Sequence, residues 1–216
     1  MPKFSFKEFE VEHIIKPKLK NSYLSIDKQL QIVVKTPKVS QAFVHQLLLQ
    51  KEHWLRKHYA SKIQNRPQEV QLTKEVLLFG EIVKINNPKV LYLQKKLQSC
   101  KSSAILKTYD NFYKTTAENY LLPRVEYFAS LMNLSFESIK YRKMKRRWGS
   151  CSSLKVLTFN TQLIKVKKEL IDYVIVHELA HLKHMNHSKT FHLLVEKYLP
   201  NAKQLREELK NTEISA

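Results

Sequence analysis

Apolar and polar residues alternate in short runs through the first 36 residues, a pattern that is typical of β-strands. Residues 23–26 and 30–34 are two such runs, and the polar segment 27–29 between them predicts a hairpin. From Val39 to about Lys62 the apolar spacing becomes helical, with Ser40 as a suitable N-cap. The chain therefore begins with a β-rich region that carries one long helix.

A second strand-like segment and a second helical segment come next in the chain. The apolar runs 77–85 and 90–93 predict a second pair of strands that turns at residues 86–88, Asn-Asn-Pro. A long helical pattern follows from about Ser103 to Met132, and Pro123 inside it predicts a kink or two helices. We expect the aromatic residues of this helix to be core.

Strand-like segments return after the long helix. Residues 139–148 include six basic side chains, so that a strand there would carry charge on both faces and would line a cleft or contact a partner. After a turn at 149–153, the run 156–160 predicts a strand that is suited to hold an extended peptide by strand addition. An amphipathic helix is predicted over 191–198.

Between these segments lies the stretch that carries the most chemistry, Val176-His-Glu-Leu-Ala-His-Leu-Lys-His-Met-Asn-His-Ser188. His177 and His181 are four residues apart, so on a helix they lie about 40° apart on one face. Two imidazoles in that arrangement can hold one zinc ion, and Glu178 can accept a proton from a zinc-bound water. An apolar stripe on the opposite side, Ile171, Ile175, Leu179 and Leu182, would bury the helix and leave the histidines facing a cleft.

A catalytic zinc ion needs a third protein ligand and an open fourth position. His184 would return to the same face if the helix continued without a break. His187 can reach the ion only if the chain turns first, and Asn186 and Ser188 are residue types that form turns and caps. The residues alone leave both candidates open, with the turn formers favouring His187.

Composition restricts the alternatives. The 216 residues include 38 Lys and Arg against 19 Asp and Glu, a net charge of +19, which would attract nucleic acid or another anionic partner. The two cysteines are far apart, so neither a disulfide framework nor a thiolate zinc site is expected. With only two glycines, the chain has no glycine-rich phosphate loop. No apolar run is long enough for a membrane span and the first residues lack a signal-peptide core, so a cytoplasmic protein is predicted.

Three sequence blocks together resemble one known family. They are Arg147-Trp-Gly-Ser-Cys-Ser-Ser153 with Phe159-Asn160, then Ile171-Asp-Tyr-Val-Ile-Val-His-Glu-Leu-Ala-His181, and Asn186-His-Ser188. This combination resembles the YgjP-like zinc metallopeptidase family, which is related to the SprT-like and WLM-type metallopeptidases. The resemblance covers most of the chain and implies His177, His181 and His187 as zinc ligands and Glu178 as the base. One departure is His192, where the family often has Trp.

The resemblance implies an α+β fold, with a zincin-like metallopeptidase domain and a β-rich N-terminal portion. We expect residues 1–100 to form the β-rich region with one long helix and 101–216 to form the metallopeptidase domain, as two domains or packed as one unit. The implied activity is hydrolysis of peptide bonds in cytoplasmic proteins, with one zinc ion per chain and a protein or peptide substrate. Candidate donors to the oxyanion are Arg146, Arg147 and His192. The alternative is a nucleic-acid-associated protein, or a DNA-linked protease recruited by its basic surface. Oligomeric state does not follow from the sequence.

Overall fold

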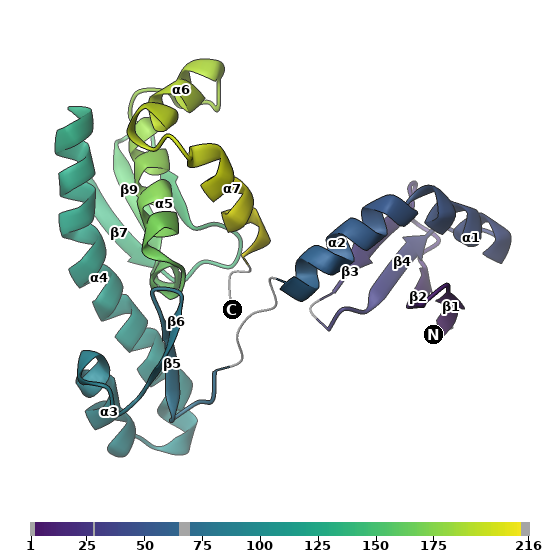
Figure 1. Ribbon diagram of the computed structural model, residues 1–216, viewed down its shortest axis with the longest axis horizontal. Helices are drawn as coiled ribbons and strands as arrows, with labels where there is room; N and C mark the ends of the chain where they lie inside the picture. The colour runs from purple at the N-terminus through teal and green to yellow at the C-terminus, as the bar shows by residue number, and fades with distance from the viewer. Residues whose placement is uncertain (1–2, 28, 65–69, 213–216) are drawn as a thin grey trace. The chain divides into compact units, whose positions relative to one another are not determined.

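A computed structural model describes residues 3–27, 29–64 and 70–212 (Figure 1). The chain forms two compact units, Met1–Arg66 and Pro67–Ala216. The observed division therefore lies well before residue 100, where the sequence led us to expect it. The reason is that the segment after residue 70 packs into the second core, to which it contributes Val76, Leu78, Ile85, Val90 and Leu93.

The first unit is a four-stranded sheet with two helices. Strands β1 (Lys3–Phe6), β2 (Phe9–Ile15), β3 (Tyr23–Ile26) and β4 (Ile32–Thr36) lie in the order β1-β2-β4-β3, with β2 parallel to β4 and the other pairs antiparallel. The predicted hairpin is confirmed as β3 and β4. In place of one helix there are two, α1 (Gln41–Gln50), capped by Ser40, and α2 (Glu52–Gln64).

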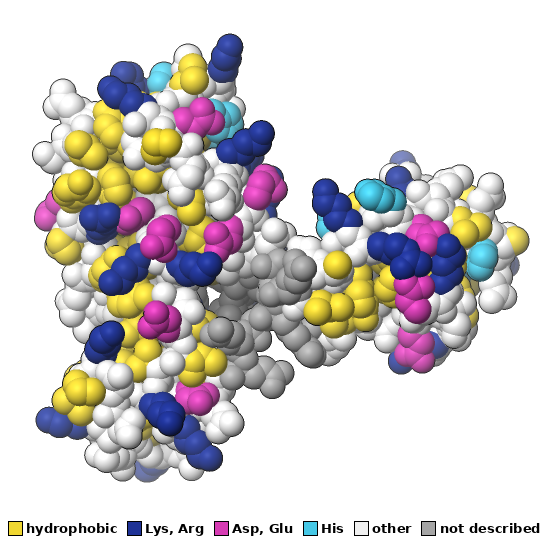
Figure 2. Space-filling model, viewed as in Figure 1, with side chains coloured by type: hydrophobic (Ala, Val, Ile, Leu, Met, Phe, Trp, Pro, Cys, Tyr) yellow, Lys and Arg dark blue, Asp and Glu magenta, His cyan; other side chains and the backbone are white. Residues whose placement is uncertain are grey.

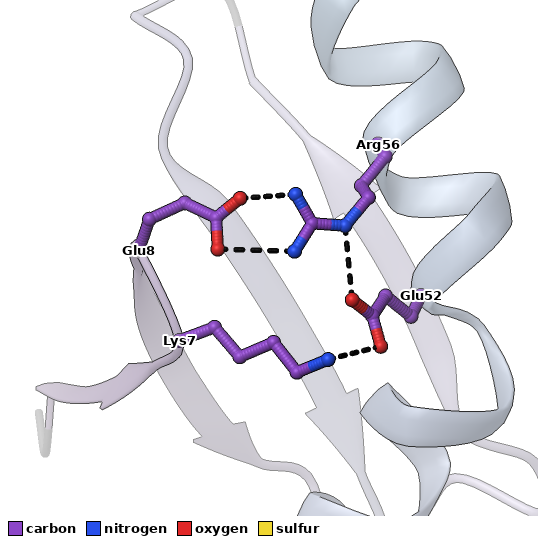
Figure 3. A network of polar contacts seen from close by, with 4 residues as sticks. All are labelled: Lys7, Glu8, Glu52 and Arg56. Atoms are coloured by element: carbon purple, nitrogen blue, oxygen red, sulfur yellow. Dashed lines mark hydrogen bonds and ion pairs between the residues drawn. The ribbon is translucent and has the colours of Figure 1, made fainter.

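Apolar side chains from the sheet and from both helices form the core of this unit. The buried set is Phe6, Phe9, Val11, Ile26, Ile32, Val34, Val44, Leu48 and Leu55. A surface network of four charged residues ties the β1–β2 turn to α2 (Figure 3). In it Lys7 contacts Glu52 at 2.5 Å, and Arg56 contacts both Glu8 and Glu52.

The second unit begins with a hairpin and a short helix. Strands β5 (Glu75–Leu78) and β6 (Glu81–Lys84) pair through a two-residue turn in which Phe79 and Gly80 both have positive φ. The chain does turn at residues 85–87, where the N–H of Asn87 donates to the carbonyl of Lys84 at 3.0 Å, but the strand predicted at 90–93 is wrong. Asn87 caps a 3₁₀ turn, Pro88–Val90, which leads directly into α3 (Leu91–Gln98). Asn followed by Pro indicates a helix start as well as a turn, which is why the sequence was ambiguous there.

Helix α4 (Ile105–Met132) follows a 3₁₀ turn, Ser102–Ala104, and continues through the exposed Pro123 as one element, so the division into two helices does not occur. Its aromatic residues Tyr109, Phe112, Tyr113 and Phe128 are core as predicted, whereas Tyr127 is 54% exposed. Asn133, in the left-handed conformation, ends the helix.

The remaining elements surround the centre of the second unit. Strands β7 (Ser138–Arg142), β8 (Gly149–Cys151) and β9 (Val156–Asn160) form a sheet in the order β7-β9-β8. A 3₁₀ turn, Thr161–Lys165, leads to α5 (Lys168–Ala180), followed by α6 (Lys189–Tyr198) and α7 (Ala202–Asn211). Helices α4 and α5 lie side by side, with α4 against β7 and α5 against β8 and α7 (Figure 1). Among the described residues, no helix is both long and apolar enough to cross a membrane.

Candidate metal centre

The centre is built on α5, one of the most buried helices of the second unit. Ile171, Ile175 and Leu179 are fully buried, as the apolar stripe predicted, and Leu182 packs partly buried against the same core. This burial fixes the rotation of the helix, because the stripe and the histidines occupy opposite sides. His177 is therefore held at the boundary between the core and a cleft.

The chain turns directly after α5. His181 is the C-cap of the helix, and α6 begins at Lys189 with the Ser188 hydroxyl accepting the Phe191 N–H. The turn brings His187 back over the helix, with its Nε2 3.0 Å from Nε2 of His177.

Three imidazoles converge as a result. One ring nitrogen from each of His177, His181 and His187 lies within 4.8 Å of the other two. The ring of Phe191, which is fully buried, packs against all three at centroid distances of 4.6–4.9 Å. Phe191 therefore forms an apolar floor that restricts the orientation of the imidazoles.

His184 approaches the centre with its backbone. Its carbonyl oxygen accepts a hydrogen bond from Nδ1 of His181 at 3.0 Å, which leaves Nε2 of His181 with its lone pair free. The side chain of His184 is outside the group of three converging nitrogens that the described residues form. His184 is therefore positioned to orient the imidazole of His181.

The donor set fits a zinc ion. Zinc–nitrogen bonds are about 2.0–2.1 Å, so two nitrogens on one tetrahedral ion are roughly 3.4 Å apart. The 3.0 Å between His177 and His187 is close to that spacing. Burial, together with the charges that His181 and His187 would carry, lowers the pKa of His177 to about 3. His177 is therefore neutral, and neutral imidazole is the form that binds metals.

Glu178 is the buried carboxylate of the centre. It is 6% exposed, and burial raises its pKa to about 8 although the nearby charge of Arg147 opposes the rise. Gly149 lies directly against it, because a Cβ added there would be 2.7 Å from both Cγ and Oε1 of Glu178. Only glycine leaves room for the carboxylate in this position. Sequence reasoning assigned Gly149 to a turn and missed this contact.

The strand beside Glu178 is β8, and not β9 as the sequence analysis assumed. Strand β9 is the centre of the sheet, parallel to β7 and antiparallel to β8, so it has no free edge for a peptide. The N–H of Asn160 donates to the carbonyl of Trp148 at 2.8 Å. Since bonded and non-bonded pairs alternate along an antiparallel ladder, the backbone groups of Gly149 and Cys151 point away from β9. They form an edge next to Glu178.

Asn160 holds the basic segment that leads into β8. Its side chain is fully buried and donates to the carbonyls of Met144 and Arg147 at 2.8 and 2.9 Å. Its Oδ1 accepts from the N–H groups of Met144 and Gln162. The predicted strand at 139–148 therefore ends at Arg142, and the rest is a loop fixed by this amide. The sequence placed Asn160 in a motif without indicating this role.

The three predicted oxyanion donors are separated by the fold. Arg146 lines a cavity of about 370 Å³ that also reaches His177 and Glu178, and Arg147 acts on Glu178 through its charge. The ring of His192 lies 6.3 Å from that of His187, on the side of a second cavity. Arg206 of α7 lines both cavities, and sequence reasoning did not find it.

His45, His53 and His58 are exposed in the first unit, as expected of surface residues.

The chain is similar to one protein family and to two solved structures. The model of the YgjP-like metallopeptidase domain matches residues 20–212. The curated proteins contain no significant match. Among solved structures, the chain is similar to the metallopeptidase zymogen abylysin of Pyrococcus abyssi, with 25% identity, a TM-score of 0.38, and coverage of 40% of this chain and 89% of that one. For the metallopeptidase zymogen jannalysin of Methanocaldococcus jannaschii the values are 24%, 0.37, 40% and 90%.

The family match is the finding that identifies the chain, because it covers well over half of the residues. It begins within the first unit and extends to the end of α7, so it includes the converging histidines, Glu178 and the loop that Asn160 holds. The protein is a zinc metallopeptidase, a hydrolase with an α+β, zincin-like fold. The chain belongs to the YgjP-like metallopeptidase family.

Proposed function

We propose that the protein hydrolyses peptide bonds with one zinc ion per chain, held by His177, His181 and His187. The observation that carries the proposal is the convergence of three imidazole nitrogens within 4.8 Å beside the buried Glu178. A zinc ion bound there would lower the pKa of water and polarise the carbonyl of the substrate. Three protein nitrogens leave a fourth position open, which is the arrangement of catalytic zinc sites.

Glu178 is the proposed general base. Its carboxylate follows His177 on the same helix and lies in the cavity that His177 also lines. It accepts the proton that water loses when it attacks the scissile carbonyl, and it then delivers the proton to the leaving amine. The close contact with Gly149 limits the positions that the carboxylate can take, because the side chain cannot move toward β8.

The free edge of β8 is the proposed binding site for the substrate backbone. An extended peptide can pair with the outward groups of Gly149 and Cys151 as an added strand. Because Gly149 contacts Glu178, a peptide paired at this edge passes directly by the proposed base. This arrangement accounts for binding without requiring a particular side chain of the substrate.

Two measurements test the proposal. Purified protein is expected to contain about one zinc ion per chain, and less than about a tenth of that after expression with sufficient zinc would contradict it. Glu178→Gln is expected to lower kcat/KM by about 10²- to 10⁴-fold with the zinc content unchanged. Glu169→Gln, the same substitution in the exposed first turn of α5, is the control. Full activity of Glu178→Gln would show that Glu178 is not the general base.

That the substrates are cytoplasmic proteins remains a prediction from the sequence. The alternative of a nucleic-acid-associated protein is not favoured, because the family match indicates a peptidase. On the face that Figure 2 shows, lysine and arginine side chains are scattered among acidic ones. Within the basic segment, Lys143 is engaged with Asp110 at 2.9 Å.

A further inference from the structure

The cavity beside Glu178 has a lining that selects for charge. Its volume is about 370 Å³, a size that suits one residue of a peptide. Its apolar walls come from three elements: Trp148 at the start of β8, Val174 on α5 and Leu209 on α7. Since it also includes His177 and Glu178, it is continuous with the proposed metal centre.

Three cations enter this cavity, Arg146 from the loop before β8 and Arg206 and Lys210 from α7. Lys210 is already compensated by Glu207, at 2.6 Å. Within residues 3–27, 29–64 and 70–212, neither Arg146 nor Arg206 has a carboxylate within 4.0 Å. Glu178 is the one acidic residue among the lining residues that the structure describes. The positive charge of the two guanidinium groups is therefore larger than the negative charge that the lining residues supply.

The neighbouring cavity, of about 310 Å³, gives the contrast. It shares Tyr173, His177 and Arg206 with the first, but its further lining includes both Glu196 and Glu207 against Lys203. Its charges are thus close to balanced. Arg206 and His177 line the first cavity together. A group bound by Arg206 in the first cavity therefore lies close to the reacting atoms.

We propose that this cavity is a substrate subsite that binds a carboxylate next to the scissile bond through Arg206 and Arg146. The inference rests on the proposed peptidase function and adds the substrate class. The carboxylate can be an Asp or Glu side chain of an internal residue, or the free C-terminus of the peptide. Guanidinium groups bind carboxylates with paired, charge-assisted hydrogen bonds, and the apolar walls exclude water from them.

Quenched fluorescent peptides with one common sequence test the proposal. Either position beside the scissile bond carries Glu, Gln or Leu, and a second series ends at that position as free acid or amide. The wild type is expected to prefer one carboxylate over its neutral counterpart by about 10-fold or more in kcat/KM. A preference for Glu over Gln identifies the side chain, and a preference for acid over amide identifies the C-terminus.

Variants connect the preference to this cavity. Arg206→Gln is expected to reduce the preference to about 2-fold or less, and Arg206→Lys to retain part of it, because lysine keeps the charge without the paired donors. Lys203→Gln is the matched control, since it removes one positive charge from the same helix but lines only the neighbouring cavity. It is expected to leave the preference unchanged. If Arg206→Gln does not fold, Arg146→Gln replaces it.

The outcomes separate this inference from the proposed function. Cleavage of all peptides with no carboxylate preference, or with a preference for Leu, would overturn the subsite while the peptidase stands. A carboxylate preference that Arg206→Gln leaves intact would also overturn it. If no peptide is cleaved, the proposed function fails, and fluorescence anisotropy then decides the subsite. Tighter binding of the Glu or free-acid peptide, lost in Arg206→Gln, supports the subsite, and equal binding of charged and neutral peptides refutes it.

Discussion

The N-terminal unit keeps its charged contacts on the surface, whereas the second unit buries a carboxylate, Glu178. In the first, Glu8, Glu52 and Arg56 form exposed ion pairs. Its buried polar residues, within the described part of the chain, are His13 and Thr36, which hydrogen-bond to each other at 2.8 Å across β2 and β4. In the second unit the buried polar residues among those described are Asn160, Thr161, Gln162 and Glu178. Of these, Glu178 lines the proposed site and Asn160 holds the loop that leads into β8.

The same residue type responds in opposite ways in the two units. A hydrogen bond from Lys7 lowers the pKa of Glu52, and one from Arg56 lowers the pKa of Glu8. Burial raises the pKa of Glu178 instead. An exposed carboxylate that is paired with a cation is stabilised in its charged form and is a weak base. A desolvated carboxylate has a raised pKa and is a better proton acceptor. The contrast supports Glu178, in the second unit, as the proposed base.

The largest effect that we predict concerns the third metal ligand. His187→Ala is expected to lower zinc affinity by orders of magnitude, as His181→Ala would, because a ligand nitrogen is lost. His184→Ala is expected to cost at most about 10- to 100-fold, because its backbone carbonyl still orients His181. Chelator competition on the two variants measures the difference. An empty site in His184→Ala with a filled one in His187→Ala would reverse the assignment.

The next largest effect tests whether buried polar groups hold the site together. Asn160→Ala removes the hydrogen bonds that this fully buried amide makes with the backbone of Met144 and Arg147. We expect a loss of about 3 kcal/mol in the free energy of unfolding. Thermal denaturation, with the exposed Asn119→Ala as control, measures it. A loss no larger than that of the control would show that the loop is held by other contacts.

A smaller effect tests the fit between β8 and the proposed base. Gly149→Ala places a methyl group against Glu178, so the carboxylate has to shift. We expect kcat/KM to fall by about 10- to 100-fold, because small displacements of catalytic groups are costly. Ser150→Ala on the same strand is the control. Unchanged activity of Gly149→Ala would mean that Glu178 does not act from the observed position.

The smallest effect that we predict concerns the exposed ion pairs of the first unit. Arg56→Gln breaks the exposed network of the first unit (Figure 3). Because exposed ion pairs contribute little, we expect the Tm, the zinc content and kcat/KM to stay within error of the wild type. Measurement at low and high salt checks this. A loss of activity at unchanged Tm would show that the surface of the first unit takes part in catalysis.

Local patterns were sufficient for those parts of the fold that depend on neighbouring residues. The helix that carries His177, Glu178 and His181 follows from a 3.6-residue period, and its buried side follows from the apolar stripe. The hairpin of β3 and β4 is also local, because a short polar segment joins two apolar runs. The YgjP-like resemblance rests on such local blocks, and the family match confirms it. The assignment of the three ligands and of the base stays a prediction.

Only the tertiary structure decided what lies opposite these local elements. The contact of Gly149 with Glu178, the hold of Asn160 on Arg147 and the approach of Arg206 to His177 join residues from separate elements. The central place of β9 and the division of the chain before residue 70 depend equally on packing. Periodicity gives the side that an element buries but not the partner it meets. The partner is set by how the core as a whole excludes water and satisfies its polar groups.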